Sequence, residues 1–252
     1  MVVYLAGFKT IENRYTKSTK DISLLSSFWE HNGRKFGDYV LQEKHILDSG
    51  AFTAINDKSG KYKNFDWDNY VKKYIEFIKT TNQKLFFELD IDCVVGLQKV
   101  EYYRNKIADA IGIAPIVVWH SSRGIDYFRK CCNDYPYVAL SLTSKSPSGK
   151  YFRSNLGAIK WFIDYAHESN CKIHGLGFTN IEWLYKLPFD SVDSTSWIDA
   201  RFGAYSTYRN GIMIKITNPD KKTYLLNNSR CRMYIYSFDE WVKFQKYAEK
   251  NL

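Results

Sequence analysis

The sequence predicts a single-domain α/β protein, a closed (β/α)8 barrel of the TIM type that spans residues 1–252. Three observations predict this fold. Short apolar or aromatic runs alternate with stretches of helical period along the whole chain, and no Pro-, Gly- or Ser-rich linker interrupts them. Eight of these runs are candidate strands, which is the number that a closed barrel needs. The chain has 252 residues, of which 45% are hydrophobic, and this is enough material for one core of that size.

The candidate strands are short runs that are rich in apolar, β-branched or aromatic residues. In chain order they are Val2–Ala6, His45–Asp48, Leu85–Asp90, Pro115–Trp119, Tyr137–Leu142, Lys172–Gly177, Asp190–Asp193 and Ile212–Ile216.

Helical stretches separate the strands. Trp67, Tyr70 and Tyr74 fall on one apolar stripe with helical spacing, which predicts a helix that faces the core. Ser237 followed by Glu240 forms a capping-box pattern that predicts the start of the last helix. An open doubly wound sheet is the alternative architecture, but it usually carries a glycine-rich phosphate turn after its first strand, and no such turn is present here.

Charge and cysteine content restrict the class of protein. Lysine and arginine exceed aspartate and glutamate by 36 to 27, and the net charge of +9 is typical of proteins that bind phosphate-rich partners or simply of a basic surface. Five cysteines without a C-x-x-C pair argue against a disulfide framework and a four-cysteine zinc site. Because no apolar run spans a membrane and no signal peptide opens the chain, we expect a cytoplasmic protein without a membrane partner.

Carboxylates follow several predicted strands. Asp48, Asp90 and Asp193 each end an apolar run, and the carboxyl ends of barrel strands form the active-site face. A single aspartate at such a position can be a helix N-cap, but three beside small-residue turns indicate an open acidic site. Paired carboxylates suit attack at an anomeric carbon, so the pattern predicts glycosyl transfer. His120 and His174 also lie near strand ends and are interpreted as structural, because neither has a partner at metal-ligand spacing.

Four segments resemble the tRNA-guanine transglycosylase superfamily, most closely its short phage and bacterial branch that inserts 7-deazaguanines into DNA. They occur in the order of the family and cover residues 2–216, most of the chain. The segments are Asp48-Ser49-Gly50-Ala51-Phe52, Leu89-Asp90-Ile91, Gly175-Leu176-Gly177 and Phe189-Asp190-Ser191-Val192-Asp193-Ser194-Thr195-Ser196-Trp197.

The resemblance implies a role for each matching residue. Asp193 matches the nucleophile that forms a covalent glycosyl intermediate, and Asp48 matches the group that transfers the proton of the leaving and entering bases. Asp90 matches the carboxylate that recognises the guanine edge. Further substrate-binding residues implied by the resemblance, or placed beside these at the strand ends, are Ser49, Phe52, Ser141, Gly175 and Leu176.

The sequence also differs from the family. Asp190 is a rival nucleophile because it directly follows Phe189, although Asp193 fits the continuation of the motif better and Asp190 lies early in its strand. The tRNA enzymes carry a zinc site of three cysteines and a histidine after the nucleophile, whereas only Cys231 follows Asp193 here. We therefore expect no zinc of that kind and no other cofactor.

The expected partners are DNA and a small 7-deazaguanine base such as preQ0, and a homodimer like that of tRNA-acting relatives stays open. Arg201, Arg209 and Lys215 follow the nucleophile segment and are candidates for phosphate contacts, or else belong to an ordinary basic surface. Three other functions stay open at this point: the same reaction on tRNA, an inactive nucleic-acid-binding barrel, and an unrelated glycoside hydrolase.

Overall fold

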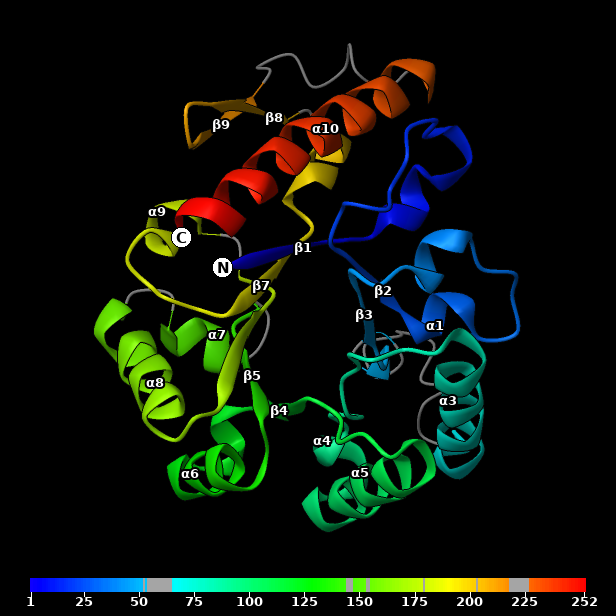
Figure 1. Cartoon of the computed structure of the whole chain (residues 1–252), viewed down its shortest axis with the longest axis vertical. Coiled ribbons are helices and arrows are strands. Elements are labelled where there is room, and N and C mark those ends of the chain that lie inside the picture. The colour runs from blue at the N-terminus through cyan, green and yellow to red at the C-terminus, as the bar shows by residue number, and fades with distance from the viewer. Residues whose placement is uncertain are drawn as a thin grey trace.

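Seven parallel strands form one curled sheet in the order β3-β2-β1-β7-β6-β5-β4 (Figure 1). This computed structural model describes residues 1–51, 53, 65–143, 147–152, 155–178, 180–202, 204–217 and 227–252. The strands of the sheet are β1 (Val2–Ala6), β2 (Leu24–Ser27), β3 (His45–Asp48), β4 (Val117–Trp119), β5 (Tyr137–Ser141), β6 (Lys172–Leu176) and β7 (Ser191–Ser194).

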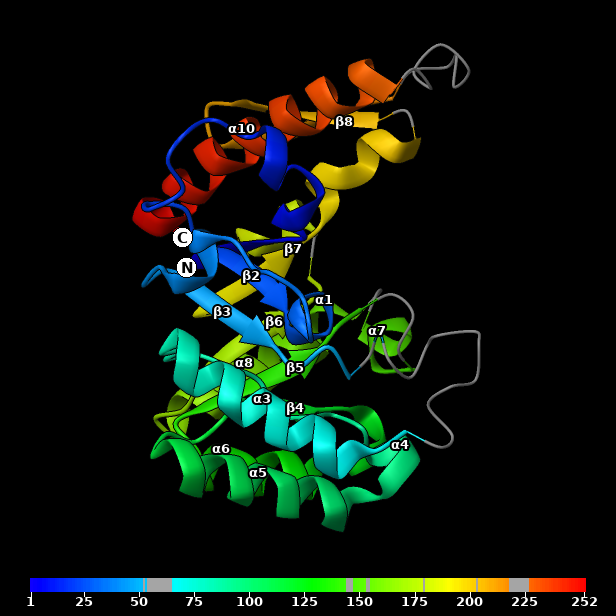
Figure 2. The same cartoon turned by 90° about the vertical axis from the view of Figure 1, so that its right-hand side faces the viewer.

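Helices surround the outer face of the sheet. In Figure 2 the strands point toward the side that carries α1, α4 and α7. None of the helices in the described residues has the length and hydrophobicity to span a membrane. The α-helices are α1 (Phe28–His31), α3 (Trp67–Thr81), α4 (Asp92–Val95), α5 (Leu97–Ile111), α6 (Ile125–Asp134), α7 (Pro147–Phe152), α8 (Leu156–Glu168), α9 (Ile181–Leu184) and α10 (Asn227–Asn251). The 3-10 helices are η1 (Phe8–Thr10), η2 (Glu12–Arg14), η3 (Asp38–Leu41), η5 (Ser121–Arg123) and η6 (Ser196–Phe202).

The prediction of an α/β fold is confirmed, but a closed barrel of eight regular strands is not what the structure contains. The segment 85–90, predicted as a strand, makes one isolated parallel bridge to each edge of the sheet, Leu47 to Phe86 and Phe87 to Ile116. The ladder stops there because the next amide, that of Val118, donates to the Glu88 carboxylate at 2.9 Å. A side chain thus replaces the backbone acceptor that would extend the strand.

The predicted eighth strand lies outside the sheet. Residues Ile212–Thr217 form β9, which pairs in antiparallel fashion with β8 (Ala204–Arg209). The turn between them is Asn210-Gly211, with φ values of +46° and +86°, and this dipeptide favours a two-residue hairpin. The place in the sheet is occupied by β2, which the sequence analysis did not predict.

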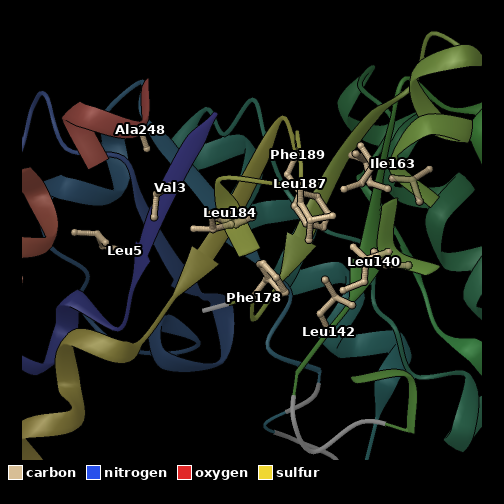
Figure 3. Packing of buried hydrophobic residues seen from close by; sticks show 14 of the residues in the cluster. Val3, Leu5, Leu140, Leu142, Ile163, Phe178, Leu184, Leu187, Phe189 and Ala248 are labelled. Atoms are coloured by element: carbon tan, nitrogen blue, oxygen red, sulfur yellow. The ribbon is translucent and has the colours of Figure 1, made fainter. Parts of the chain in front are cut away.

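Alternation along each strand divides the core into two layers. Val3 and Leu5 of β1 face outward, and Figure 3 places Val3 beside Ala248 of α10. Tyr4 and Ala6 face the opposite way and pack inside the curl of the sheet with apolar residues from the other strands. A second outer cluster lies between α3, α5 and the segment 85–91. The interior of the curl is therefore a packed core, and it supports the residues at the carboxyl ends of the strands.

Helix α10 begins earlier than the sequence indicates. It starts at Asn227, so the predicted cap Ser237 lies inside the helix. The Ser237 hydroxyl instead accepts a hydrogen bond from the Ser206 amide at 3.1 Å, and Glu240 accepts one from the Tyr208 amide at 2.7 Å. The Ser-x-x-Glu pattern thus joins α10 to the β8–β9 hairpin instead of capping the helix.

Candidate functional site

A pocket of about 270 Å³ opens at the carboxyl ends of the parallel strands. This size suits a ligand no larger than a nucleoside. Its wall combines glycine, hydroxyl and apolar side chains with four carboxylates, and no lysine or arginine is among the described residues that line it. The lining residues are Ala6, Gly7, Leu25, Ser27, Glu30, Asp48, Asp90, Ser141, Thr143, Leu176, Gly177, Asp193 and Thr195.

Strand alternation explains why polar groups meet here. The last inward position is polar on β2, β3, β5 and β7, where it is Ser27, Asp48, Ser141 and Asp193. On three of these strands the inward residue two positions earlier is apolar and buried; these residues are Leu25, Ile46 and Ala139. Because parallel strands end at one edge, one period of the pleat separates the packed interior from the acidic pocket.

Asp193 is held by two donors. The Gly177 amide lies 2.5 Å from Asp193 Oδ1, and His174 Nε2 lies 3.3 Å from the same oxygen. Gly177 has a φ of +69°, and a Cβ there would lie 2.6 Å from Thr143 Cγ2. The positive φ and the lack of space beside Thr143 both favour glycine at the position whose amide binds Asp193.

Asp48 has the most strongly shifted pKa among the pocket carboxylates that the structure describes. Burial first, and then the charges of Asp90 and Asp193, raise its pKa from 3.8 to about 7, although the backbone hydrogen bond from Gly50 opposes this rise. Gly50 has a φ of +74°, and a Cβ there would lie 2.7 Å from the Trp29 backbone nitrogen. The turn after β3 thus requires glycine. Because its pKa is near 7, Asp48 can hold or release a proton near neutral pH.

Asp90 faces the pocket from the segment after the isolated bridges. Its Oδ2 lies 3.1 Å from His120 Nε2, and the Asp90 side chain is 9% exposed. His120 was interpreted as structural, as was His174. Each of them contacts a carboxylate of the pocket, His120 that of Asp90 and His174 that of Asp193.

Glu30 is a pocket residue that the sequence analysis missed. Burial raises the pKa of Glu30, whereas a hydrogen bond from the Ser27 backbone and the charge of Lys9 lower it. The Ser27-x-x-Glu30 spacing is a capping-box pattern at the start of α1. That pattern could have located both β2 and this carboxylate.

The remaining predicted pocket residues divide into two groups. Ser141 and Leu176 line the pocket. Ser49 is fully buried and is not among the lining residues, and its carbonyl accepts a hydrogen bond from Tyr70 at 2.6 Å. A Cβ on Gly175 would point toward Val192, Phe178 and Phe189 in the outer core. Of Gly175 and Gly177, it is therefore Gly177 that borders the pocket. Phe52 lies outside the described residues.

The predicted phosphate contacts do not reach the pocket in the described part of the chain. Arg209 is exposed at the end of β8, beside a turn in which the Tyr185 hydroxyl donates to the Gly211 carbonyl. Lys215 Nζ lies 2.6 Å from Asp199 Oδ2 and is engaged in this ion pair. The backbone of Arg201 belongs to η6, and its side chain lies outside the described part of the structure.

The rival nucleophile Asp190 lies just before β7, at the opposite end of this strand from the pocket. Its Oδ2 accepts a hydrogen bond from the Ile173 amide at 2.8 Å and lies 3.0 Å from His167 Nε2. Asp190 therefore joins β6, β7 and α8, whereas Asp193 lines the pocket.

Together these contacts describe an acidic pocket whose carboxylates differ in their surroundings. Among the described residues, no group of three or more histidine, cysteine, aspartate or glutamate side chains could hold a metal ion. No protein-family model matches the chain, and a search of curated proteins finds no significant match.

Proposed function

We propose that this protein replaces guanine in DNA with a 7-deazaguanine base such as preQ0, through a covalent aspartyl-glycosyl intermediate. One observation carries the proposal: three carboxylates from three different segments meet in one pocket, and each has different surroundings. Base exchange needs a nucleophile, a proton carrier and a group that recognises the base, and these are three separate tasks for three carboxylates.

Asp193 is the nucleophile in this proposal. Its carboxylate attacks C1′ of the nucleotide, a C–O bond forms, and the bond between C1′ and N9 breaks with its electron pair passing to the guanine. The Gly177 amide, 2.5 Å from Oδ1, holds the carboxylate in one orientation. Such fixed placement of a reacting group lowers the entropic part of the barrier.

Asp48 carries the proton. With a pKa of about 7, it is partly protonated at neutral pH and can donate to the departing guanine. The carboxylate that remains then accepts the proton of the entering base, whose nitrogen attacks C1′ as the bond to Asp193 breaks. The proton count balances over the two steps, and Asp48 returns to its starting form.

Asp90 recognises the base. The N1–H and exocyclic amine of guanine are hydrogen-bond donors, and adenine does not present this pair of donors to a carboxylate. His120 lies 3.1 Å from Asp90 Oδ2 and orients the group. An unpaired carboxylate beside the wrong base would be costly, so this position is suited to discrimination.

Labelled preQ0 tests the proposal. It is supplied with single-stranded DNA, duplex DNA and tRNA in parallel, together with the wild-type protein, Asp193→Ala and Asp190→Ala. We expect label in DNA with the wild type and with Asp190→Ala, and a loss of about 10⁴-fold or more with Asp193→Ala. Asp190→Ala is the matched control because it removes a carboxylate that lies beside the same strand but outside the pocket. Circular dichroism verifies that both variants are folded.

The other outcomes have definite meanings. Label only in tRNA would change the nucleic acid and keep the reaction. DNA binding without label in any polymer would indicate an inactive binding protein, and release of sugar from chromogenic glycosides would indicate a hydrolase. Retained exchange in Asp193→Ala would remove Asp193 from the mechanism.

A further inference from the structure

We infer that His174 is a positioning residue that selects which oxygen of Asp193 attacks the sugar, and that Ser191 and Tyr137 fix the tautomer of His174. This inference rests on the proposed function. It concerns a row of side chains inside the curl of the sheet, directly below the pocket, and the resemblance to the transglycosylases assigned no role to them.

The contacts form a continuous chain across three neighbouring strands. The Tyr137 hydroxyl lies 2.6 Å from Ser191 Oγ, and Ser191 Oγ lies 2.5 Å from His174 Nδ1. On the other side of the ring, His174 Nε2 lies 3.3 Å from Asp193 Oδ1. His174 is fully buried and Ser191 is 2% exposed, so these groups satisfy one another without bulk water.

The order of donors along this chain follows from the acceptor at its end. An attacking carboxylate has lone pairs only, so His174 Nε2 must carry a hydrogen to bind it. In a neutral imidazole, Nδ1 then has a lone pair and accepts the hydrogen of Ser191. Ser191 Oγ in turn accepts the hydrogen of Tyr137. The reverse order would place the bare Nε2 lone pair against a carboxylate, which is repulsive at this distance.

Aromatic packing holds the plane of the imidazole. The Phe87 ring centroid lies 5.2 Å from that of His174 at an interplanar angle of 60°, and the Tyr4 centroid lies 6.3 Å away at 52°. Both rings belong to the inner core of the curled sheet. Packing and hydrogen bonds together leave His174 one orientation, with Nε2 toward the pocket.

Both donors act on the same carboxylate oxygen. Gly177 and His174 each bind Oδ1, and among the described residues no hydrogen bond reaches Oδ2. Oδ2 is therefore the oxygen that bonds to C1′. In the covalent intermediate Oδ1 becomes the ester carbonyl oxygen and keeps both donors. No proton moves along the chain in this step, so His174 positions the nucleophile and does not act as an acid or a base.

Kinetics test this role with two substitutions at one site. His174→Leu removes the donor, and His174→Gln retains an N–H near the position of Nε2. We expect His174→Leu to lower the single-turnover rate of intermediate formation by about 10²–10³-fold, with KM for DNA changed less than threefold. We expect His174→Gln to recover the rate to within about tenfold of the wild type. A purely structural role predicts parallel losses in folded fraction and KM, and no rescue by glutamine.

His167→Leu is the matched control, because His167 also contacts an aspartate, Asp190, at 3.0 Å but lies away from the pocket. Its rate should match that of the wild type. Equal rates for His174→Leu and the wild type would overturn the inference.

Nitrogen-15 NMR of labelled histidine provides a readout without turnover. We expect the wild-type His174 signal to report Nε2–H with a bare Nδ1, and Ser191→Ala to convert it to a mixture of tautomers. A wild-type Nδ1–H tautomer or an imidazolium would overturn the inference. If no polymer is labelled while His174 shows the expected tautomer, the proposed function fails and the donor order stands, so the two failures are distinguishable.

Discussion

Two groups of carboxylates meet at the segment 88–92, and they differ in whether arginine side chains bind them. In the pocket, Asp48, Asp90 and Asp193 face one another, and no lysine or arginine is among the described residues of its wall. Beside it, Glu88 and Asp92 flank Asp90 along the chain, and both are bound by arginine. We call Glu88, Asp92, Arg104 and Arg123 the compensated network.

Ion pairs and hydrogen bonds satisfy the charged groups of the compensated network. Glu88 is fully buried, with Arg104 Nε 2.6 Å from Oε2 and Arg123 Nη1 2.7 Å from Oε1. Arg123 Nη2 lies 2.6 Å from Asp92 Oδ1, and the remaining Arg104 nitrogens donate to Tyr127 and Tyr135. Each charge therefore meets an opposite charge or a hydrogen-bond partner, as burial requires.

The presence or absence of an arginine partner distinguishes the carboxylates that stabilise the fold from those that line the pocket. Where Glu88 ends the short ladder beside β4, the chain supplies two arginines to hold it. Two residues further along the chain, Asp90 faces Asp48 and Asp193 in the pocket, and burial together with the charges of these neighbours raises the pKa of Asp48. Uncompensated acidic groups of this kind cost stability, and they are typical of sites that bind or react. The compensated network also anchors both sides of the segment that presents Asp90.

Glu88→Ala should produce the largest loss of stability. It leaves Arg104 and Arg123 buried without their main partner, so we expect a loss of about 3–5 kcal/mol in the free energy of unfolding. Urea denaturation followed by circular dichroism measures it. The matched control is Asp90→Asn, two residues away in the pocket, which should change stability by less than about 1 kcal/mol. Equal losses in the two variants would contradict the distinction between the compensated network and the pocket.

The sequence predicted the strand ends better than the sheet. Asp48, Asp90 and Asp193 meet as expected, because the carboxyl ends of parallel strands share one edge whatever the exact strand count. The strand count itself was wrong in detail. Segment 85–90 contains Glu88, whose side chain takes the Val118 amide, and this competition depends on a residue 30 positions away. No local pattern reports such a contact.

Other misses had a local signal. Asn210-Gly211 marks a hairpin, and it could have removed Ile212–Ile216 from the predicted sheet. Ser27-x-x-Glu30 could have indicated β2 and α1. The contacts of His120 and His174 had no such signal, because each is made to a carboxylate on another segment, and the spacing of residues along the chain does not show which strands are neighbours.

Asp48→Asn should change how the free energy of unfolding depends on pH. Because the pKa is about 7 in the folded protein and 3.8 ordinarily, the folded state binds the proton more tightly than the unfolded chain. The contribution of Asp48 to the free energy of unfolding is therefore fully present below about pH 4, and it is lost as the pH rises through about 7. Relative to wild type, Asp48→Asn should gain at most about 4 kcal/mol in unfolding free energy between about pH 4 and pH 8. Denaturant titrations of both proteins across this range measure the gain, and a difference that is independent of pH would contradict it.

Asp92→Asn should show the smallest effect, with the opposite pH dependence. Burial opposes the shift, but the hydrogen bond and charge of Arg123 hold the pKa of Asp92 below its ordinary value. A lowered pKa stabilises the fold above the unfolded value, and this stability is lost as pH falls through the folded value. We expect Asp92→Asn to cost about 1–2 kcal/mol at pH 7 and less near pH 3, because its side chain is partly exposed and Glu88 still holds Arg123. The same denaturant titrations measure it. If the cost of Asp92→Asn rose toward low pH, the arginine would not be compensating this carboxylate, and the contrast with Asp48 would lose its physical basis.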